Sequence, residues 1–369
     1  MKNFFTRNII DWHLIENKRI MPWKGEKNPY KIWISEITLQ QTRVMQGLAY
    51  YNNFMIEFPT LDSLANASDD AVFKVWEGLG YYSRCKNLLF TARYIVHHLN
   101  GNFPTNYENL LKLKGIGPYT AAAVASFAYG LPHAVVDGNV FRVLARFFGE
   151  TVPIDSIKGK ELFTALANKL LYKDDSAAFN QAIMDFGATV CKPQLPACQT
   201  CVLQQKCTAY NFGLVNKLPV KEKRLVKRKR FFYYFIFVTE EGVLVRKRME
   251  KDIWENLYEF YLFESDKELN WKPTDITNWL IEQLGIKNHS IIGISPNYTQ
   301  KLTHQNLIGK FILIRPNPIP PSLKNFLQID VSELETVPFP KFINQYLQDN
   351  LSVIKEVQAS NRPNQESCL

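Results

Sequence analysis

Residues 111–127 read LKLKGIGPYTAAAVASF. Apolar residues at helical spacing flank a short G-I-G segment, so the stretch predicts a helix, a tight hairpin at Gly115 and Gly117, and a second helix that begins near Pro118. The first N–H groups of such a helix have no intrahelical partners and can bind a phosphate without reading base sequence. A plain turn between two helices is the alternative interpretation.

Helical spacing continues on both sides of this hairpin. Asp69 and Asp70 suit a helix that starts at Ala71. Asp137 is expected at another helix start, where the helix dipole favours an ionised carboxylate. The segments with helical spacing are residues 1–19, 69–80, 85–101, 107–115, 119–130 and 139–150, with C-cap candidates Gly101, Gly115, Gly130 and Gly149. Residues 1–215 are therefore predicted to form a mostly α-helical domain.

The sequence changes character after residue 215. Residues 216–230 form a linker, in which KLPVKEKRLVKRKR at 217–230 holds eight Lys or Arg and one Glu. Such a run is a solvated linker, a strap along a nucleic-acid backbone, or both. Aromatic and β-branched residues then predict a hairpin over 231–248, strands at 288–295 and 307–316, and a helix over 274–286 that ends at Gly285. We expect a smaller α+β domain over 231–350 and a disordered polar tail over 351–369.

Bulk composition limits the class of protein. With 369 residues, of which 46% are hydrophobic, the chain is long enough for two globular domains and too apolar to be disordered throughout. It has no run of about 18 apolar residues, so no membrane span is expected. The formal net charge is +9, and the basic run carries most of it. We expect a monomer in the cytoplasm, associated with the nucleoid.

Four of the six cysteines fall within residues 191–207, CKPQLPACQTCVLQQKC, with the spacing C-x6-C-x2-C-x5-C. Four thiolates this close can surround one zinc ion or one [4Fe-4S] cluster. Zinc sites usually pair two C-x2-C knuckles, and the bacterial ferredoxin run is tighter and ends in proline. The spacing therefore favours one [4Fe-4S] cluster outside the ferredoxin pattern, with zinc as the alternative, and its ligands would be Cys191, Cys198, Cys201 and Cys207. Disulfides are not expected, because no secretory signal precedes them.

Several blocks of the chain resemble one known superfamily. LKGIGPYTAAAV at 113–124, VDGNVFRVLARFFG at 136–149 and the four cysteines are similar to the helix-hairpin-helix DNA glycosylases with an iron–sulfur cluster. Within this superfamily, SEITLQQT at 35–42 and WEGLGYYSRCKNL at 76–88 resemble the MutY-type adenine DNA glycosylase family. Tyr119 stands where lyases of the endonuclease III type carry Lys, and those lyases also lack a C-terminal domain.

The resemblance implies a fold and an activity. The fold would be a helix-hairpin-helix glycosylase domain followed by a smaller α+β domain similar to MutT (Nudix). The substrate would be duplex DNA with adenine opposite 8-oxoguanine or guanine, and the products would be free adenine and an abasic site. The alternatives are an endonuclease III-like glycosylase and lyase for oxidised pyrimidines, and a non-catalytic iron–sulfur module that binds DNA.

Two carboxylates are the candidate catalytic groups. Glu36 lies in the apolar stretch IWISEITL, which should raise its pKa and let it hold a proton near neutral pH. Asp137, ionised at its helix start, suits the stabilisation of a developing oxocarbenium ion. Two carboxylates with separated pKa values are typical of enzymes that break glycosidic bonds. By resemblance, Tyr119 and Asn139 position this pair.

The resemblance also implies the residues that bind DNA. Gln41 and Thr42 would contact the opposite strand, and Tyr81 would fill the base stack beside the lesion. The adenine pocket would be bordered by Arg19, Trp23 and Gln181, while Lys24 stands where some relatives have Arg.

In the C-terminal domain, no run of carboxylates of the Nudix hydrolase type is found, so we expect lesion recognition rather than hydrolysis. The loop that would read 8-oxoguanine is KLTHQN, with Leu302, Thr303 and His304.

Overall fold

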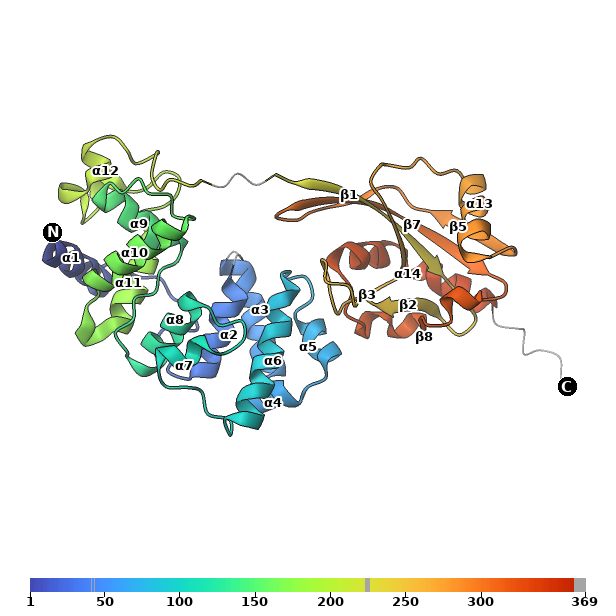
Figure 1. Cartoon of the computed structure of the whole chain (residues 1–369), viewed down its shortest axis with the longest axis horizontal. Coiled ribbons are helices and arrows are strands. Elements are labelled where there is room, and N and C mark those ends of the chain that lie inside the picture. The colour runs from blue at the N-terminus through green and yellow to red at the C-terminus, as the bar shows by residue number, and fades with distance from the viewer. Residues whose placement is uncertain (41, 43, 223–225, 362–369) are drawn as a thin grey trace. The chain divides into compact units, whose positions relative to one another are not determined.

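The computed structural model describes residues 1–361 apart from 41, 43 and 223–225, and the chain forms two compact units (Figure 1). The first unit combines Met1–Asn66 with Lys86–Arg224, and the second combines Ala67–Cys85 with Leu225–Leu369. A helical region and a smaller α+β region are therefore confirmed. The sequence placed the whole of 1–215 in one domain, and it did not predict that residues 67–85 pack with the C-terminal part.

The first unit consists of helices and short 3-10 turns. Its helices are α1 (Lys2–Ile15), α2 (Pro29–Leu39), α3 (Val44–Glu57), α4 (Leu61–Asn66), most of α6 (Tyr82–His98), α7 (Tyr107–Leu111), α8 (Pro118–Tyr129), α9 (Gly138–Phe148), α10 (Ile157–Leu170), α11 (Ser176–Thr189) and α12 (Thr208–Asn211). The 3-10 turns are Lys173–Asp175, Cys198–Thr200 and Gln204–Lys206. Among the described residues, no helix is both long and apolar enough to cross a membrane.

Capping residues fix the ends of the helices around the hairpin. Gly115 adopts φ +79°, and Gly130 and Gly149 end α8 and α9 in the left-handed conformation, as the sequence predicts. Asp137 caps the start of α9. One predicted start is wrong by two residues: helix α5 (Asp69–Val75) begins at Asp69 rather than Ala71, because the Ser68 side chain accepts from the Ala71 N–H and takes the capping position.

The core of the first unit lies between α1, α9, α10 and α11. Aromatic side chains from all four helices, including Phe5, Trp12, Phe147, Phe163 and Phe186, are buried together. The predicted amphipathic N-terminal helix is thus confirmed as α1, with Phe5, Ile9 and Trp12 on its buried face. Cys191, Cys201 and Cys207 pack against the margin of the same core.

The second unit contains two sheets. The larger sheet has the order β4-β1-β7-β5, with β6 also paired to β7, and the smaller has the order β3-β2-β8. Their bounds are β1 (Arg228–Phe237), β2 (Val243–Lys247), β3 (Tyr258–Glu259), β4 (Tyr261–Ser265), β5 (His289–Ile294), β6 (Tyr298–Lys301), β7 (Gln305–Pro316) and β8 (Leu327–Ile329). The two strands and the turn of the predicted hairpin over 231–248 are present, but the predicted pairing of the strands is wrong. β1 pairs with β7 along its length and with β4 over Phe231–Phe235, and among the described residues a single bridge, Val238 to Val243, joins the two sides of the turn towards β2.

Helices cover both faces of the larger sheet. Tyr233, Phe235 and Phe237 of β1 pack with α13 (Pro273–Leu284), whereas Tyr234 and Phe311 stack towards Phe342 on α14 (Lys341–Asn361). Short 3-10 turns at Pro321–Leu323 and Val331–Thr336 flank β8. β1 is therefore buried on both faces, which explains its continuous aromatic run. The predicted tail from residue 351 is also wrong in part, because α14 continues to Asn361 and buries Ile354 and Val357.

Candidate active site

A cavity of about 510 Å³ opens in the first unit. Its walls come from α2, α8, α9 and α11 and from the loop between α1 and α2. The predicted residues that line it are Arg19, Trp23, Glu36, Thr42, Tyr119, Asp137, Asn139 and Gln181. Lining residues that the sequence did not single out are Met21, Leu39, Gln40, Val44, Val136, Gly138, Phe141 and Met184. The fold thus brings both candidate carboxylates and the predicted adenine pocket into one cavity.

Glu36 lies in α2, a helix started by Pro29 and by the side chain of Asn28, which accepts from the Tyr30 and Lys31 N–H groups. Nearly every residue around Glu36 in this helix is buried. Burial raises the pKa of Glu36 to about 7; the hydrogen bond from Tyr119 acts in the opposite direction, and the negative charge of Asp137 adds to the rise. The Tyr119 hydroxyl donates to the Oε2 atom of Glu36 at 2.6 Å. The raised pKa predicted from the apolar stretch is therefore confirmed.

Asp137 caps α9 and faces the same cavity. Its Oδ1 atom accepts from the Asn139 and Val140 N–H groups, both at 2.8 Å, and its Oδ2 atom accepts from the Asn139 side chain at 2.7 Å. Burial raises the pKa of Asp137, while these hydrogen bonds and the positive charge of Arg142 oppose the rise. The helix start is confirmed. The sequence predicted that this position favours the ionised carboxylate, whereas burial outweighs the hydrogen bonds and raises the pKa of Asp137.

A buried carboxylate that the sequence missed anchors the loop that carries Arg19 and Trp23, the predicted adenine-pocket residues. Asp185 is fully buried in α11 and accepts from the Nη1 atom of Arg19 at 2.7 Å, from Lys24 at 2.8 Å and from the side chain of Asn17 at 2.9 Å. Lys24 also donates to the carbonyl oxygen of Arg19 at 2.5 Å. Two cations on one buried carboxylate hold the loop that carries Arg19 and Trp23. Lys24 is not among the residues that line this cavity, but it lines another pocket that shares Trp23, Glu36 and Gln181 with it.

The four cysteines of the predicted cluster are free thiols in one loop after α11. Burial raises the pKa of Cys201 to about 12, a backbone hydrogen bond from Leu203 lowers it, and the charges of Cys191, Cys207 and Cys198 raise it further. Two of the thiols contact the same residue, because the Arg146 guanidinium donates to the Cys191 Sγ atom and the Cys207 thiol donates to the Arg146 carbonyl oxygen at 3.6 Å. In the described part of the chain, no group of three or more His, Cys, Asp or Glu side chains is arranged to hold a single metal ion. As a donor set, four neighbouring soft sulfur atoms fit an iron–sulfur cluster.

Two arginines of α9 hold this cysteine loop. Arg146 donates to the Sγ atom of Cys191 at 3.4 Å and to the carbonyl oxygen of Lys192 at 2.7 Å. Arg142 donates to the carbonyl oxygen of Cys191 at 2.7 Å and to the Oδ1 atom of Asn139 at 2.8 Å. The cysteine loop is thus connected, through Arg142 and Asn139, to Asp137.

The hairpin lies between α7 and α8, as predicted. Gly115 needs its left-handed backbone, and an added Cβ would lie 2.6 Å from the Cβ atom of Asn87. Gly117 is the N-cap of α8, and an added Cβ there meets nothing within 4 Å. Open space at the N-terminus of α8 leaves its first N–H groups accessible to a ligand such as a phosphate. Gln41 lies outside the described residues.

The second unit has a cavity of its own, of about 520 Å³. It is lined by Gly78–Ser83, Asp252–Glu255, Gln300–Gln305 and Lys341. Leu302, Thr303 and His304 form the tip between β6 and β7, where the Leu302 N–H donates to the carbonyl oxygen of Gln305 at 2.7 Å. Tyr81, which has φ +50°, makes a hydrogen bond through its hydroxyl to the Oγ1 atom of Thr303. The structure therefore brings Tyr81, Thr303 and His304 together, although the sequence assigned Tyr81 to the helical domain.

The fold and this arrangement of carboxylates beside a hairpin define a DNA glycosylase of the helix-hairpin-helix class. Residues 34–169 match the HhH-GPD superfamily of base excision DNA repair proteins, and residues 233–349 match the NUDIX domain. The structure of a thermostable thymine-DNA glycosylase is 28% identical, with a TM-score of 0.53, and covers 57% of this chain and 97% of its own. An endonuclease III–DNA complex, at 22% identity and a TM-score of 0.50, covers 58% of this chain and 98% of its own and shares the fold.

Curated relatives specify the family. The adenine DNA glycosylase of Buchnera aphidicola subsp. Schizaphis graminum is 35% identical over 72% of this chain and 77% of its own length. That of Buchnera aphidicola subsp. Baizongia pistaciae is 33% identical over 85% of this chain and 87% of its own. The human adenine DNA glycosylase is 40% identical over 56% of this chain and 39% of its own. The chain belongs to the adenine DNA glycosylase family, enzymes of base excision repair. Glycosylases of the endonuclease III and MutY type generally carry a [4Fe-4S] cluster.

Proposed function

We propose that the chain hydrolyses the N-glycosidic bond of adenine opposite 8-oxoguanine, or opposite guanine, in duplex DNA. The observation that carries this proposal is the cavity in which Glu36, Tyr119, Asp137 and Asn139 face Arg19, Trp23 and Gln181. A base must leave the stack to reach buried carboxylates, and a cavity of about 510 Å³ has room for it.

Glu36 and Asp137 have different roles in the proposed reaction. Glu36, protonated because of its raised pKa, donates a proton to the departing adenine as the bond to the sugar breaks. Asp137 stabilises the positive charge that develops on the sugar, and the bonds from the Asn139 and Val140 N–H groups fix its direction. Water then adds to the sugar and returns a proton to Glu36. Tyr119 orients Glu36, and a phenol offers no amine for a Schiff base, so the strand stays intact.

The second cavity would read the base opposite adenine. Tyr81 enters the base stack, while Thr303 and His304 supply hydrogen-bonding groups at the tip between β6 and β7. The hydroxyl of Thr303 already binds Tyr81, so the two predicted lesion contacts form one surface. Carboxylates of this unit, such as Asp252, Glu259 and Glu264, are paired with arginines, which supports a reading role over metal-dependent hydrolysis.

DNA backbone contacts would come from both parts of the chain. Gly115 and Gly117 present the N–H groups at the start of α8 to one phosphate, and Gln41 and Thr42 contact the strand opposite adenine. The basic residues of the run at 217–230, apart from Arg230, which is bonded to Asp252 and Glu264, add attraction to phosphates that does not depend on base sequence. The expected cytoplasmic location stays a prediction.

Cys191, Cys198, Cys201 and Cys207 would hold one [4Fe-4S] cluster, which would fix their loop rather than take part in the hydrolysis. We expect the purified protein to be yellow-brown, with broad visible absorbance and about four irons per chain. Cys201→Ser should lower the iron content and the melting temperature, because the loop packs against the core of the first unit. Cys85→Ser, at a buried thiol outside the loop, should retain the iron. A colourless protein with one zinc per chain would contradict the assignment.

The activity is tested on four duplexes that carry A:8-oxoguanine, A:G, A:T or thymine glycol. We expect excision to be fastest for A:8-oxoguanine, with strand breaks only after alkali, and little covalent complex trapped by borohydride. Excision of thymine glycol with efficient trapping would favour the endonuclease III-like alternative. No excision from any duplex would favour a non-catalytic DNA-binding module.

A further inference from the structure

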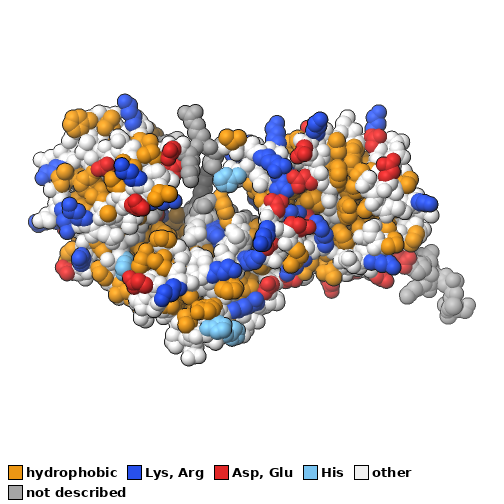
Figure 2. Space-filling model, in the orientation of Figure 1, with side chains coloured by type: hydrophobic (Ala, Val, Ile, Leu, Met, Phe, Trp, Pro, Cys, Tyr) orange, Lys and Arg blue, Asp and Glu red, His pale blue; other side chains and the backbone are white. Residues whose placement is uncertain are grey.

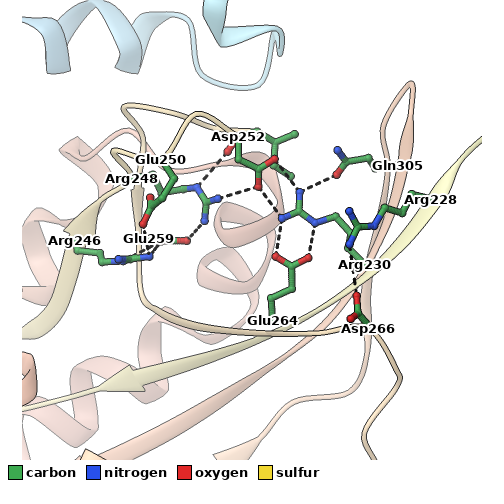
Figure 3. A network of polar contacts seen from close by, with 11 residues as sticks. Arg228, Arg230, Arg246, Arg248, Glu250, Asp252, Glu259, Glu264, Asp266 and Gln305 are labelled. Atoms are coloured by element: carbon green, nitrogen blue, oxygen red, sulfur yellow. Dashed lines mark hydrogen bonds and ion pairs between the residues drawn. The ribbon is translucent and has the colours of Figure 1, made fainter.

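Arg230 stands at the centre of a charged network in the second unit (Figure 3). It donates to Glu264 at 2.6 Å from both Nε and Nη2, to the two oxygens of Asp252 at 3.0 and 2.6 Å, and to the Oε1 atom of Gln305 at 3.0 Å. These bonds use all five N–H groups of the guanidinium. Arg230 is 8% exposed, and its guanidinium lies 4.8 Å from the ring centre of Phe232. Its donors are therefore all used within the unit, and Arg230, Asp252, Glu264 and Gln305 together line a further, more open pocket of about 520 Å³.

The three partners of Arg230 come from three different segments. Glu264 lies in β4, the strand beside β1 in the sheet. Asp252 lies in the segment between β2 and β3, outside both strands. Gln305 is the first residue of β7 and directly follows His304. One guanidinium thus fixes two otherwise separate segments to the end of β1.

Those two segments both contribute to the lining of the second cavity. Asp252–Glu255 contribute to it from one segment and Gln300–Gln305 from the other, whereas Arg230 is not among the lining residues. Arg248 reinforces the first segment by donating to the carbonyl oxygen of Ile253 at 3.2 Å and by contacting Asp252 at 3.4 Å. The same segment holds Trp254 at φ +64°, a conformation that a non-glycine residue keeps only when its surroundings impose it.

Three arginines are matched by three carboxylates in this network, and the side chains of Asp252 and Glu264 are 33% and 32% exposed. Arg230, Arg246 and Arg248 face Asp252, Glu259 and Glu264, and Glu259 is fully buried between two of the arginines. On the face drawn in Figure 2, acidic and basic side chains of this unit are likewise interspersed. A lysine at position 230 would keep the charge but lacks the planar fork that reaches both carboxylates and Gln305 together.

We propose that Arg230 is a positioning residue for recognition of the base opposite adenine, and that it acts by holding Asp252 and Gln305 in one arrangement. This inference rests on the proposed function, in which the second cavity reads that base. 8-Oxoguanine and guanine differ by one oxygen and one N–H, so groups that distinguish them have to be held to within roughly 0.5 Å. Loosening the network should therefore reduce discrimination between 8-oxoguanine and guanine, while the adenine cavity of the first unit stays intact.

The test compares Arg230→Lys with Arg228→Lys in the full-length chain. Arg228 is a matched control, because it lies two residues earlier in β1, has a side chain 68% exposed and contacts Asp266 at 3.5 Å. Single-turnover excision is measured on A:8-oxoguanine and A:G duplexes. Arg230→Lys should lower the ratio of the two rates roughly tenfold, about the value of one base-edge contact, and leave the A:G rate nearly unchanged. Arg228→Lys should keep the wild-type ratio.

A wild-type ratio for a folded Arg230→Lys protein would overturn the inference, as would an equal loss on both duplexes. If Arg230→Lys fails to fold, Glu264→Gln takes its place, because it weakens the hydrogen bonds between Glu264 and Arg230 and leaves the lining of the second cavity unchanged. An unaltered ratio of the A:8-oxoguanine rate to the A:G rate would again overturn the inference. A wild-type protein that does not prefer A:8-oxoguanine would refute the lesion-reading function itself, which separates the two failures.

Discussion

Glu36→Gln should slow single-turnover excision of adenine by at least ~100-fold, the low end for loss of a general acid. Glutamine has the same size and can still accept the hydrogen bond from Tyr119, but it cannot release a proton to the departing base. Binding to uncleaved A:8-oxoguanine duplex should survive, because the phosphate contacts lie elsewhere. A variant that excises adenine at the wild-type rate would show that the active-site assignment is wrong.

The dependence of the excision rate on pH is a second test of Glu36 as the general acid. Burial raises the pKa of Glu36 to about 7, so the carboxyl keeps its proton below that pH and loses it above. An acid has to be protonated to act, and the wild-type excision rate should therefore fall as the pH rises through about 7. The residual rate of Glu36→Gln should lack this decline. Glu57→Gln, at an exposed glutamate of α3, should leave both the rate and the profile unchanged.

Asp137→Asn should slow excision by about 10²- to 10³-fold, the range seen when one preorganised electrostatic group is lost. The substitution removes the negative charge that faces the developing cation. It also places an amide N–H₂ opposite that of Asn139, which now donates to Asp137 at 2.7 Å, so the orienting bond is disturbed. An Asn still accepts from the N–H groups of α9, and the melting temperature should change little.

Asp175→Asn is the matched control for this variant. Asp175 also caps a helix, α11, and accepts from the Ala178 N–H at 2.9 Å. The Asp175→Asn variant should excise adenine at close to the wild-type rate. A large loss of rate in Asp137→Asn alone would therefore reflect the chemistry of the carboxylate and not its capping of a helix. Equal losses for both variants, or a normal rate for Asp137→Asn, would contradict the role of Asp137.

Local signals in the sequence predicted the parts of the fold that depend on neighbouring residues. The αL glycines at 130 and 149, the cap at Asp137 and the buried surroundings of Glu36 all follow from short segments. The resemblance to the glycosylases then predicted which of these segments meet in one cavity. Site residues such as Arg19, Gln181 and Asn139 came from that resemblance, since no spacing connects them.

Contacts between distant segments could not be predicted in this way. Arg19 and Asp185 lie 166 residues apart in the sequence, and only the folded chain shows their ion pair. The aromatic run of β1 suggested a hairpin partner close by, whereas a strand buried on both faces pairs with distant strands on both edges. The arginine network failed to stand out for the same reason, because its carboxylates are scattered between residues 252 and 264.

The division of the chain into units has a consequence for its evolution. Residues 67–85 reach the second unit through Asp70, which binds Lys247 at 2.6 Å and Tyr258 at 2.8 Å, and through Lys74, which donates to the carbonyl oxygen of Val337 at 3.1 Å. A fragment that stops before residue 225 would deprive this segment of those partners. In the gene, the codons of the two units are interleaved. A recombination that replaced only the codons for 225–369 would introduce the sheets of another protein. The retained loop with Tyr81 would then have to complete a cavity lined by the new residues.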